Sequence, residues 1–482
     1  MRRPRDSKDL KEQSIVAHLR AGEKYIEEVN MKGDVMVALI YPNTYDLAVS
    51  SLGFNLAWKR LNQVRRLRCE RFVYDESFER FYSLDSQTPL DQFKVWAFSL
   101  HFENDVLNVV KLLLKKAVPL KNLDRSDLHP VVLFGGALTY VDLPLIRKIA
   151  DVILHGDIEP MLPHLEEAFQ STDRSSLLHA FAKLPFASVP ALGKGYEGIS
   201  QCHGLDLHVP VSPLISSRGD FAGRLLVEIE RGCIHRCAYC MMGKLKKPAR
   251  FLSLEKVSDV LRRHNSVGLI ASNVTDYPWL GELIDLLERS SVSVSVSSLR
   301  LDRLSERFLN FLRRHQNSFT VALESASERL RNVLKKDLSD AQIEKALLMA
   351  RKAGFEEIKV YFMFGFDEET DHDLRAIGDV ARHILELGFR TVKFSINPFV
   401  PKRGTEMGER QMQDERTLKE KMKIISSSLP KDVKATFESL KQSKIQYIIN
   451  SMGEDCAEEF LTRVQQFSEG KIDKIVFEVA TF

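Results

Sequence analysis

The sequence is poor in cysteine and has no long apolar run. It contains 6 cysteines in 482 residues, too few and too scattered for a disulfide framework, so we expect a reducing cytoplasm. No apolar run approaches the roughly 20 residues that a membrane span requires. Charged residues follow Met1, so neither a signal peptide nor membrane attachment is expected. The net charge of +3 is too small to support nucleic-acid binding, although that class of partner stays open.

Half of the cysteines share one short loop: Cys233, Cys237 and Cys240. They follow an apolar run, 225–229, that predicts a buried strand. Three thiolates this close can converge on one metal centre, and a cube-shaped iron–sulfur cluster held by three cysteines keeps one iron open. The alternative is a zinc site with His235 or His203 as fourth ligand. His235 lies between two of the cysteines, where it is poorly placed to complete the same tetrahedron.

Most of the chain alternates between strand-like and helical patterns, which indicates an α/β fold. Apolar runs at 35–40, 95–100, 131–134 and 152–155 predict a doubly wound, Rossmann-like parallel sheet. Six further strand-like runs between 225 and 396 predict a partial (β/α)6 TIM-like barrel, with its chemistry at the C-terminal ends of the strands. The predicted domains are an N-terminal extension (1–33), the sheet domain (34–170), a linker (171–220), the barrel core (221–405) and a small helical C-terminal cap (406–482).

The two ends of the chain carry weaker patterns. Residues 13–30 favour an amphipathic helix in the N-terminal extension. Residues 415–427 and 445–466 favour helices in the cap, and 474–479 favour a short strand at its end.

The cysteine loop resembles that of the radical S-adenosylmethionine (SAM) superfamily, whose signature is Cys-x3-Cys-x-aromatic-Cys after the first barrel strand. The resemblance implies a [4Fe–4S] cluster on Cys233, Cys237 and Cys240, with SAM chelating the open iron through its amino and carboxylate groups. It also implies one-electron cleavage of SAM to a 5′-deoxyadenosyl radical. A reducing electron donor such as flavodoxin or ferredoxin would then be a partner.

The same resemblance extends to polar residues at the ends of the later barrel strands. An arginine suits the SAM carboxylate because its fork is bidentate, and a carboxylate suits ribose because it only accepts hydrogen bonds. The alternative for each position is helix capping or ordinary surface polarity. The SAM-binding residues that the resemblance implies are Tyr239, Ser272, Asn273, Ser298, Arg300, Glu324 and Gly365.

The N-terminal half resembles the cobalamin-binding domain that precedes the barrel in one class of radical SAM enzymes. The matching features are the Tyr-Pro-x-x-Tyr loop, the strand end at 98–100 and Phe-Gly-Gly at 134–136. Ala48 and Ser50 stand where cobalamin modules carry Asp and His, so no lower histidine ligand is expected. The alternative is a sheet retained as scaffold or lid. The cobalamin-binding residues implied are Tyr45, Ser51, Ser99, Leu100, Gly135, Gly136 and Gly156.

These resemblances together imply a radical SAM enzyme that uses cobalamin for methyl transfer or rearrangement. A cobalamin-independent enzyme that abstracts hydrogen directly and a non-catalytic metal-binding protein are the alternatives. A tRNA methylthiotransferase is disfavoured because that group carries three further cysteines in its N-terminal domain, whereas Cys69 alone occupies 1–200. No motif in the sequence specifies the substrate.

Overall fold

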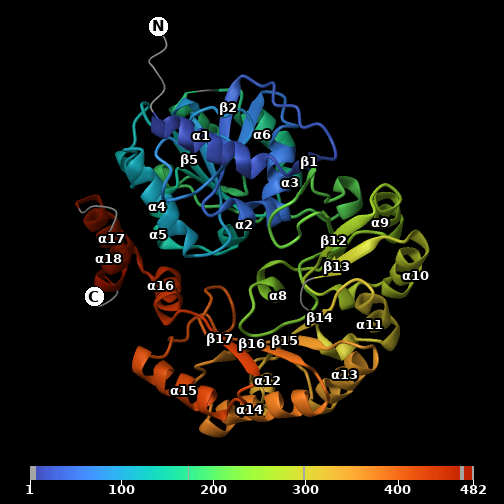
Figure 1. Cartoon of the computed structure of the whole chain (residues 1–482). Helices are drawn as coiled ribbons and strands as arrows, with labels where there is room; N and C mark the ends of the chain where they lie inside the picture. Colours follow the sequence, from blue (N-terminus) through green and yellow to red (C-terminus); the bar gives the residue numbers. More distant parts are fainter. Residues whose placement is uncertain (1–6, 172, 297–298, 467–471, 480–482) are drawn as a thin grey trace. The chain divides into compact units, whose positions relative to one another are not determined.

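The chain forms two compact units in the computed structural model, which describes residues 7–171, 173–296, 299–466 and 472–479. The N-terminal unit contains the described residues within 1–203, 210–225 and 448–482. The barrel unit contains those within 204–209 and 226–447. Each unit has its own sheet system and its own candidate site, so the two are described separately (Figure 1).

The N-terminal unit is built on a six-stranded sheet with the order β3-β2-β4-β5-β6-β7. All neighbouring strands are parallel except β7, which is antiparallel to β6. The order reverses between β2 and β4, and ligands of such sheets bind beside the strand ends at this switch point. The strands are β2 (Val35–Tyr41), β3 (Leu67–Val73), β4 (Val95–Ser99), β5 (Val131–Gly135), β6 (Val152–Leu154) and β7 (Ala187–Ser188).

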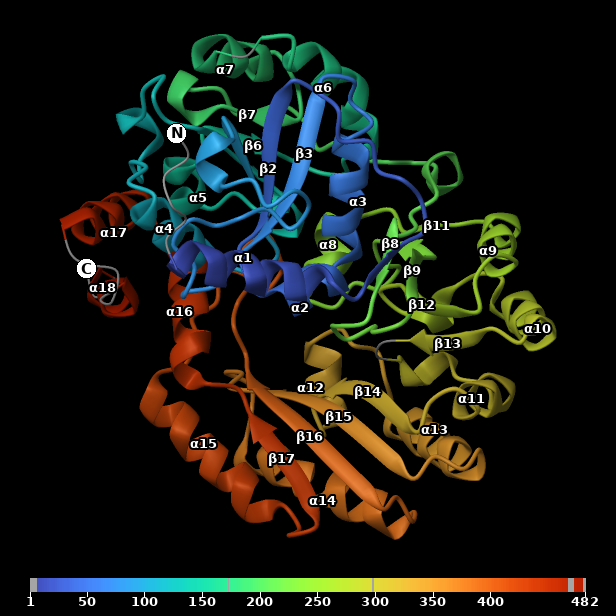
Figure 2. The same ribbon diagram turned by 45° about the horizontal axis from the view of Figure 1, so that its top comes forward.

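The predicted doubly wound sheet is confirmed, and it gains a strand that the sequence pattern did not reveal. Strand β3 lies beside β2 at one end of the sheet (Figure 2). It is buried, yet three of its residues carry charges: Arg68, Glu70 and Arg71. These charges are paired, Arg68 with Glu70 at 2.5 Å and Arg71 with Glu23 at 2.8 Å. Pairing offsets the cost of burying these charges. Because Arg68, Glu70 and Arg71 interrupt its apolar residues, the strand does not form an apolar run in the sequence.

Three expectations for the segments around this sheet are wrong. The helix expected over 13–30 is α1 (Ser7–Arg20), which is followed by β1 (Glu23–Tyr25) paired antiparallel with β8 (Leu214–Ser216). The segment 171–220, expected as a linker, carries α7 (Arg174–Ala182) and the sheet strand β7. The strand expected at 474–479 is part of a helix, α18 (Ile472–Val479), because its buried residues recur at helical spacing.

Helices pack around the sheet, and one of them comes from the far end of the chain. Helix α17 (Glu454–Gln466) contacts α5 (Pro144–Ile149), where Lys148 pairs with Glu458 at 2.9 Å. The other helices of this unit are α2 (Tyr45–Ser50), α3 (Leu52–Leu61), α4 (Asp105–Lys115) and α6 (Leu162–Ala168).

The barrel unit contains the six predicted strands in sequence order and a seventh from the predicted cap. One sheet has the order β13-β12-β9 and the other β14-β15-β16-β17, and a parallel bridge between Leu299 and Val321 joins them. Neighbours within the second sheet are parallel. The strands are β9 (Leu225–Glu228), β12 (Ser266–Ile270), β13 (Ser293–Val296), β14 (Ser318–Glu324), β15 (Glu357–Phe364), β16 (Thr391–Pro398) and β17 (Val433–Phe437).

Amphipathic helices lie along the outer side of the arc that these strands form (Figures 1 and 2). Capping boxes start two of them, at Ser339 and at Thr370. In the described part of the chain, no helix combines the length and apolar character needed to cross a membrane. The outer helices are α9 (Leu254–Leu261), α10 (Leu280–Ser290), α11 (Glu306–Arg313), α13 (Asp340–Lys352), α14 (Asp371–Glu386) and α15 (Glu415–Ser428).

Candidate active site

The cysteine loop lies between β10 (Glu230–Arg231) and the short helix α8 (Met242–Leu245). Strand β10 pairs antiparallel with β11 (Arg250–Phe251), which brings the chain after α8 back beside the start of the loop. Gly232 has a φ of +89°, and a Cβ there would lie 2.1 Å from the Lys246 carbonyl oxygen. The loop therefore requires glycine directly before its first cysteine.

The three cysteine thiols are half-buried and close enough to influence one another. Burial raises the pKa of Cys233 to about 11 and also raises that of Cys237, and the charge of Cys240 adds to both shifts. Burial thus opposes ionisation of Cys233 and Cys237, and the irons of a cluster would supply the positive charge that their thiolates need. Among the described residues no three His, Cys, Asp or Glu side chains are gathered around one point for a single metal ion. A cube-shaped cluster takes one thiolate at each of three irons and keeps the fourth iron open, and three cysteines in one loop supply that number and type of donor.

His235, a candidate fourth ligand of the zinc alternative, has another partner. Its Nε2 atom lies 2.8 Å from Oδ2 of the buried Asp276. Burial raises the pKa of Asp276, but hydrogen bonds from His235 and Asn273 outweigh that effect and hold the pKa below its ordinary range. The histidine thus ties the cysteine loop to the segment after β12, a contact that sequence reasoning missed.

The centre of the loop is fixed by backbone bonds on both sides of Ala238. Its N–H donates to the Leu334 carbonyl at 2.9 Å, and its carbonyl accepts from the Met407 N–H at 3.1 Å. Ala238, Leu334 and Met407 are buried in one apolar cluster with Phe366 and Phe399. The loop is therefore held by segments that follow α12 (Glu328–Val333) and β16, far away in sequence.

Tyr239 connects the loop to Glu324 at the end of β14 and to Lys336, which follows α12. Its hydroxyl donates to Oε1 of Glu324 at 2.9 Å, and Lys336 Nζ donates to the same oxygen at 3.0 Å. Glu324 has a φ of +66°, and the strand register shifts at this residue. A non-glycine residue in the left-handed region is strained and typical of functional sites. The structure thus brings two predicted SAM-binding residues together and adds Lys336, which sequence reasoning missed.

Arg300, predicted to bind the SAM carboxylate, is buried and already has several partners. Its Nε donates to Asp302 Oδ1 at 2.8 Å. Its Nη2 donates to the backbone carbonyls of Lys336 and Asp337. Arg300 therefore holds the turn that carries Lys336, and its positive charge opposes the rise in the pKa of Cys237 that burial causes.

Ser272 and Asn273 connect the end of β12 to the start of the cysteine loop. Ser272 Oγ donates to the Gly232 carbonyl, and the Asn273 N–H donates to Glu230 Oε2 at 3.0 Å. Asn273 Nδ2 also donates to Asp276 Oδ2 at 2.8 Å. Both predicted residues thus lie beside the cysteines, whereas Ser298, also predicted to bind SAM, lies outside the described residues.

Gly365, the last predicted SAM-binding residue, follows β15 with a φ of +94°. Its N–H donates to Glu369 Oε2 at 2.8 Å, and Glu369 pairs with Lys421 of α15 at 2.8 Å. A Cβ at Gly365 would lie 2.7 Å from Leu418 Cδ2. The position requires glycine, and the buried ion pair fixes the turn.

Glu230 is a buried carboxyl next to the cysteine loop that sequence reasoning also missed. It is 2% exposed, and its Oε1 has no hydrogen-bond partner among the described residues. Burial raises the pKa of Glu230 to about 7 from its ordinary 4.5. At neutral pH about half of the folded chains therefore hold a proton on Glu230 that the unfolded chain has released.

We expect Glu230→Gln to stabilise the barrel unit at pH 8 by about 1–3 kcal/mol and to gain little at pH 5. Between the two pKa values the folded state binds more protons than the unfolded state, so wild-type stability falls as pH rises through this range. Glutamine does not ionise, so the stability of the variant does not fall as pH rises through this range. Urea unfolding at both pH values measures the difference, with exposed Glu255→Gln as control. An equal gain at both pH values would contradict the assignment.

The N-terminal unit places polar side chains at the switch point of its sheet. Ser51 Oγ and Ser99 Oγ lie 3.4 Å and 3.2 Å from Nε2 of His101, whose ring stacks on Tyr41 with 5.3 Å between centroids. A Cβ added to Gly135 would meet nothing within 4 Å. Ser51 and Ser99, both predicted to bind cobalamin, therefore lie together. Gly135, a third predicted residue, has open space beside it, and His101 was not predicted from the sequence.

The remaining predicted cobalamin residues have roles in packing within the unit. The Tyr45 hydroxyl donates to Glu23 at 2.8 Å, and the buried Leu100 N–H donates to the Gly135 carbonyl at 2.8 Å. Gly136 and Gly156 have positive φ angles and approach neighbouring backbone closely. Packing explains these positions without a ligand.

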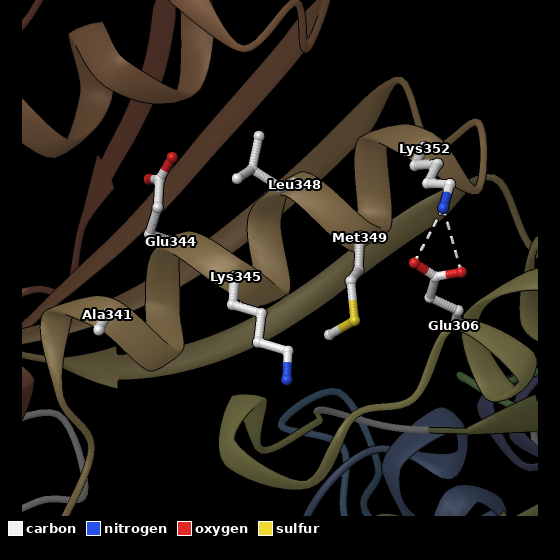
Figure 3. Close-up of a pocket in the computed structure, with 7 residues that line it drawn as sticks. All are labelled: Glu306, Ala341, Glu344, Lys345, Leu348, Met349 and Lys352. Carbon is white, nitrogen blue, oxygen red and sulfur yellow. Dashed lines mark hydrogen bonds and ion pairs between the residues drawn. The ribbon is translucent and has the colours of Figure 1, made fainter.

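A separate cavity of about 450 Å³ lies on the outer helices of the barrel unit. Figure 3 shows Glu306 of α11 paired with Lys352 of α13 at 3.0 Å on one side of it. None of the predicted site residues lines it, so it is not part of the candidate active site. The lining residues are Glu306, Ala341, Glu344, Lys345, Leu348, Met349 and Lys352.

Two family models match the chain, one in each unit. "Radical SAM proteins, N-terminal" matches residues 53–190, and "Radical SAM superfamily" matches residues 227–381, which include the cysteine loop. The chain belongs to the radical SAM superfamily. Membership of this superfamily implies a [4Fe–4S] cluster and SAM.

Curated relatives of this radical SAM protein include one of nearly equal extent. MJ0966 of Methanocaldococcus jannaschii is 26% identical over 423 residues, 86% of this chain and 88% of the relative. RimO of Desulfotalea psychrophila, a ribosomal protein uS12 methylthiotransferase, is 27% identical over 181 residues, 33% of this chain and 40% of RimO.

Two solved structures share the fold of this radical SAM protein. TsrM from Kitasatospora setae, a radical S-adenosylmethionine methyltransferase, aligns with a TM-score of 0.51 and 14% identity, covering 77% of this chain and 75% of TsrM. OxsB, a cobalamin-dependent S-adenosylmethionine radical enzyme, aligns with a TM-score of 0.50 and 12% identity, covering 73% of this chain and 52% of OxsB. The predicted fold class is confirmed.

Proposed function

We propose that this protein cleaves SAM with a [4Fe–4S] cluster on Cys233, Cys237 and Cys240 and uses cobalamin in methyl transfer or rearrangement. The observation that carries the proposal is the three-thiol loop at the end of the first barrel strand, in a chain of this superfamily. When bound, the reduced cluster supplies the electron that splits SAM into methionine and a 5′-deoxyadenosyl radical. The substrate is unknown.

The residues of the barrel unit suit the binding and orientation of SAM. The carboxylate of Glu324 only accepts hydrogen bonds, as ribose hydroxyls require. Lys336 and Arg300 provide positive charge near Cys237, which suits the SAM carboxylate. Gly365 lets the backbone turn at the end of β15, where the adenine is expected. These residues hold the cosubstrate, while the cluster supplies the redox chemistry.

Cobalamin use is supported by the N-terminal unit and by its structural relatives. The sheet has a switch point with Ser51, Ser99 and His101 beside it and open space at Gly135. OxsB is described as cobalamin-dependent and TsrM as a methyltransferase. We further propose a cytoplasmic flavodoxin or ferredoxin as electron donor, since the cluster must be reduced by one electron.

A cobalamin-independent enzyme that abstracts hydrogen is the second candidate. It is favoured by the packing roles of Tyr45, Leu100, Gly136 and Gly156, which explain those residues without a ligand. Methylthio transfer is not proposed, although RimO is a relative. The cysteines outside the loop lie far apart in the sequence, Cys69 on β3, Cys202 after β7 and Cys456 on α17, and provide no second set of three in one loop.

Anaerobic reconstitution followed by hydroxocobalamin binding tests the proposal. The protein is desalted, its visible spectrum is recorded per chain, and 5′-deoxyadenosine is measured after reduction with SAM. We expect an intact cluster, SAM cleavage and close to one equivalent of retained cobalamin. Cleavage without cobalamin retention would leave direct hydrogen abstraction as the function. An intact cluster that never cleaves SAM would contradict both candidates.

A further inference from the structure

A hydrogen-bond network joins the cysteine loop to two charged residues. Tyr239, two residues after Cys237, donates its hydroxyl hydrogen to Glu324 Oε1 at 2.9 Å. Lys336 Nζ lies 3.0 Å from Glu324 Oε1 and 3.4 Å from the Tyr239 hydroxyl. Burial raises the pKa of Cys237, and the charge of Lys336 opposes that rise. All four residues belong to the barrel unit.

The surroundings keep the Lys336 ammonium group largely out of solvent. The Lys336 side chain is 10% exposed, whereas the adjacent Lys335 is 51% exposed and pairs with Glu406. Arg300 holds the carbonyls of residues 336 and 337, so the turn presents Lys336 inward. A buried charge is screened far less by water and salt than an exposed one. Lys336 is therefore placed to act on the cluster electrostatically, and Lys335 is not.

We propose that Lys336 is a positioning residue that, with Glu324 and Tyr239, sets the reduction potential of the cluster bound by Cys237. The inference rests on the proposed function, because it requires a cluster on the three cysteines. Reduction adds one negative charge to the cluster. A nearby cation stabilises the reduced form, a nearby anion destabilises it, and hydrogen bonds to the sulfurs raise the potential. Because Lys336 and Glu324 carry opposite charges, removing each one should shift the reduction potential in opposite directions.

The expected effects on the reduction potential follow from charge. Lys336→Met removes the cation and leaves Glu324 unbalanced, so the potential falls. Lys336→Arg keeps the charge and returns the potential toward the wild-type value. Glu324→Gln removes the anion while keeping the shape of the side chain, so the potential rises. A role limited to packing would not shift the first and third variants in opposite directions.

Potentiometric titration of the reconstituted cluster, followed by the EPR signal of its reduced form without SAM, measures these shifts. Lys335→Met is the matched control, since it removes the same charge from the neighbouring, exposed position, and its potential should equal that of the wild type. Equal shifts in the two lysine variants, or shifts of the same sign for Lys336→Met and Glu324→Gln, would overturn the inference.

Failure of the proposed function has a different signature. If the wild-type protein binds no cluster after reconstitution, the proposed function fails, and this result comes before any variant is compared. Should Lys336→Met not fold, the pair Lys336→Arg and Glu324→Gln still decides the inference. The first must stay near the wild-type potential and the second must lie above it, and a Glu324→Gln potential at or below wild type would overturn the inference.

Discussion

Replacing Cys233, Cys237 or Cys240 singly by serine is expected to abolish the cluster and lower SAM cleavage roughly 100-fold or more. Even outer-shell partners of metal ligands contribute 10–100-fold to affinity or activity, and a direct ligand contributes more. A serine hydroxyl is a poor replacement because iron in such clusters prefers soft thiolates. Iron and sulfide per chain, the EPR signal after reduction, and 5′-deoxyadenosine measure the three consequences.

Cys456→Ser is the matched control for these variants. Cys456 is half-buried, like the loop cysteines, but lies on α17 of the N-terminal unit. It should keep wild-type iron content and cleavage. A wild-type protein that is colourless and contains one zinc instead of iron would contradict the cluster and leave the metal-binding protein as the interpretation. Full cleavage by a loop variant would show that the cysteine is not a ligand.

The features predicted well from the sequence are those whose cause is local. Cysteine spacing in one loop predicts its ligand chemistry, and the apolar runs of β2 and β4 are almost wholly buried strands. Strands β15 and β16 instead alternate between buried and more exposed residues, which is the pattern of a half-buried strand. The alternation of strands and helices also predicted a doubly wound parallel sheet, although β3, and with it the strand order, was not predicted. The fold class and the cysteine loop could therefore be predicted without any structure.

The features that were missed depend on contacts between residues distant in the sequence. Lys336 follows Lys335 in a charged stretch, and only the folded chain shows that one points inward and the other to solvent. His235 and Asp276 meet across 41 positions. Local pattern cannot reveal either of these contacts. Residues 474–479 are a different case, because the helical spacing of their apolar residues is present in the sequence itself and distinguishes the helix from a strand.

Arg71→Met is expected to destabilise the N-terminal unit by about 3–5 kcal/mol, the usual cost of leaving buried charges unpaired. Arg71 lies on β3 and is 1% exposed. It donates to both Glu23 carboxylate oxygens, at 2.9 and 2.8 Å, and to Asp85 at 2.8 Å. Its guanidinium also lies 4.1 Å from the centre of the Trp58 ring. Methionine keeps the apolar bulk but removes the cation closest to the buried carboxylates of Glu23 and Asp85.

Urea unfolding followed by tryptophan fluorescence measures the loss, and a triple variant separates charge from packing. Adding Glu23→Gln and Asp85→Asn to Arg71→Met removes the two carboxylates, so most of the stability should return. No recovery in the triple variant would mean that packing against Trp58, and not charge pairing, explains the loss. Arg66→Met is the control, because the Arg66–Asp34 pair of the same unit is far more exposed.

The same substitution should also affect cobalamin retention, because Glu23 holds the Tyr45 hydroxyl at 2.8 Å. Burial raises the pKa of Glu23, but Arg71 outweighs that effect and holds the pKa below its ordinary value. The stabilisation is thus present at neutral pH and is lost as pH falls through the lowered pKa. Wild-type protein should therefore lose stability faster than Arg71→Met on acidification. If the wild type and Arg71→Met bind hydroxocobalamin equally at neutral pH, the loop that contains Tyr45 does not depend on the contacts between Arg71, Glu23 and Tyr45.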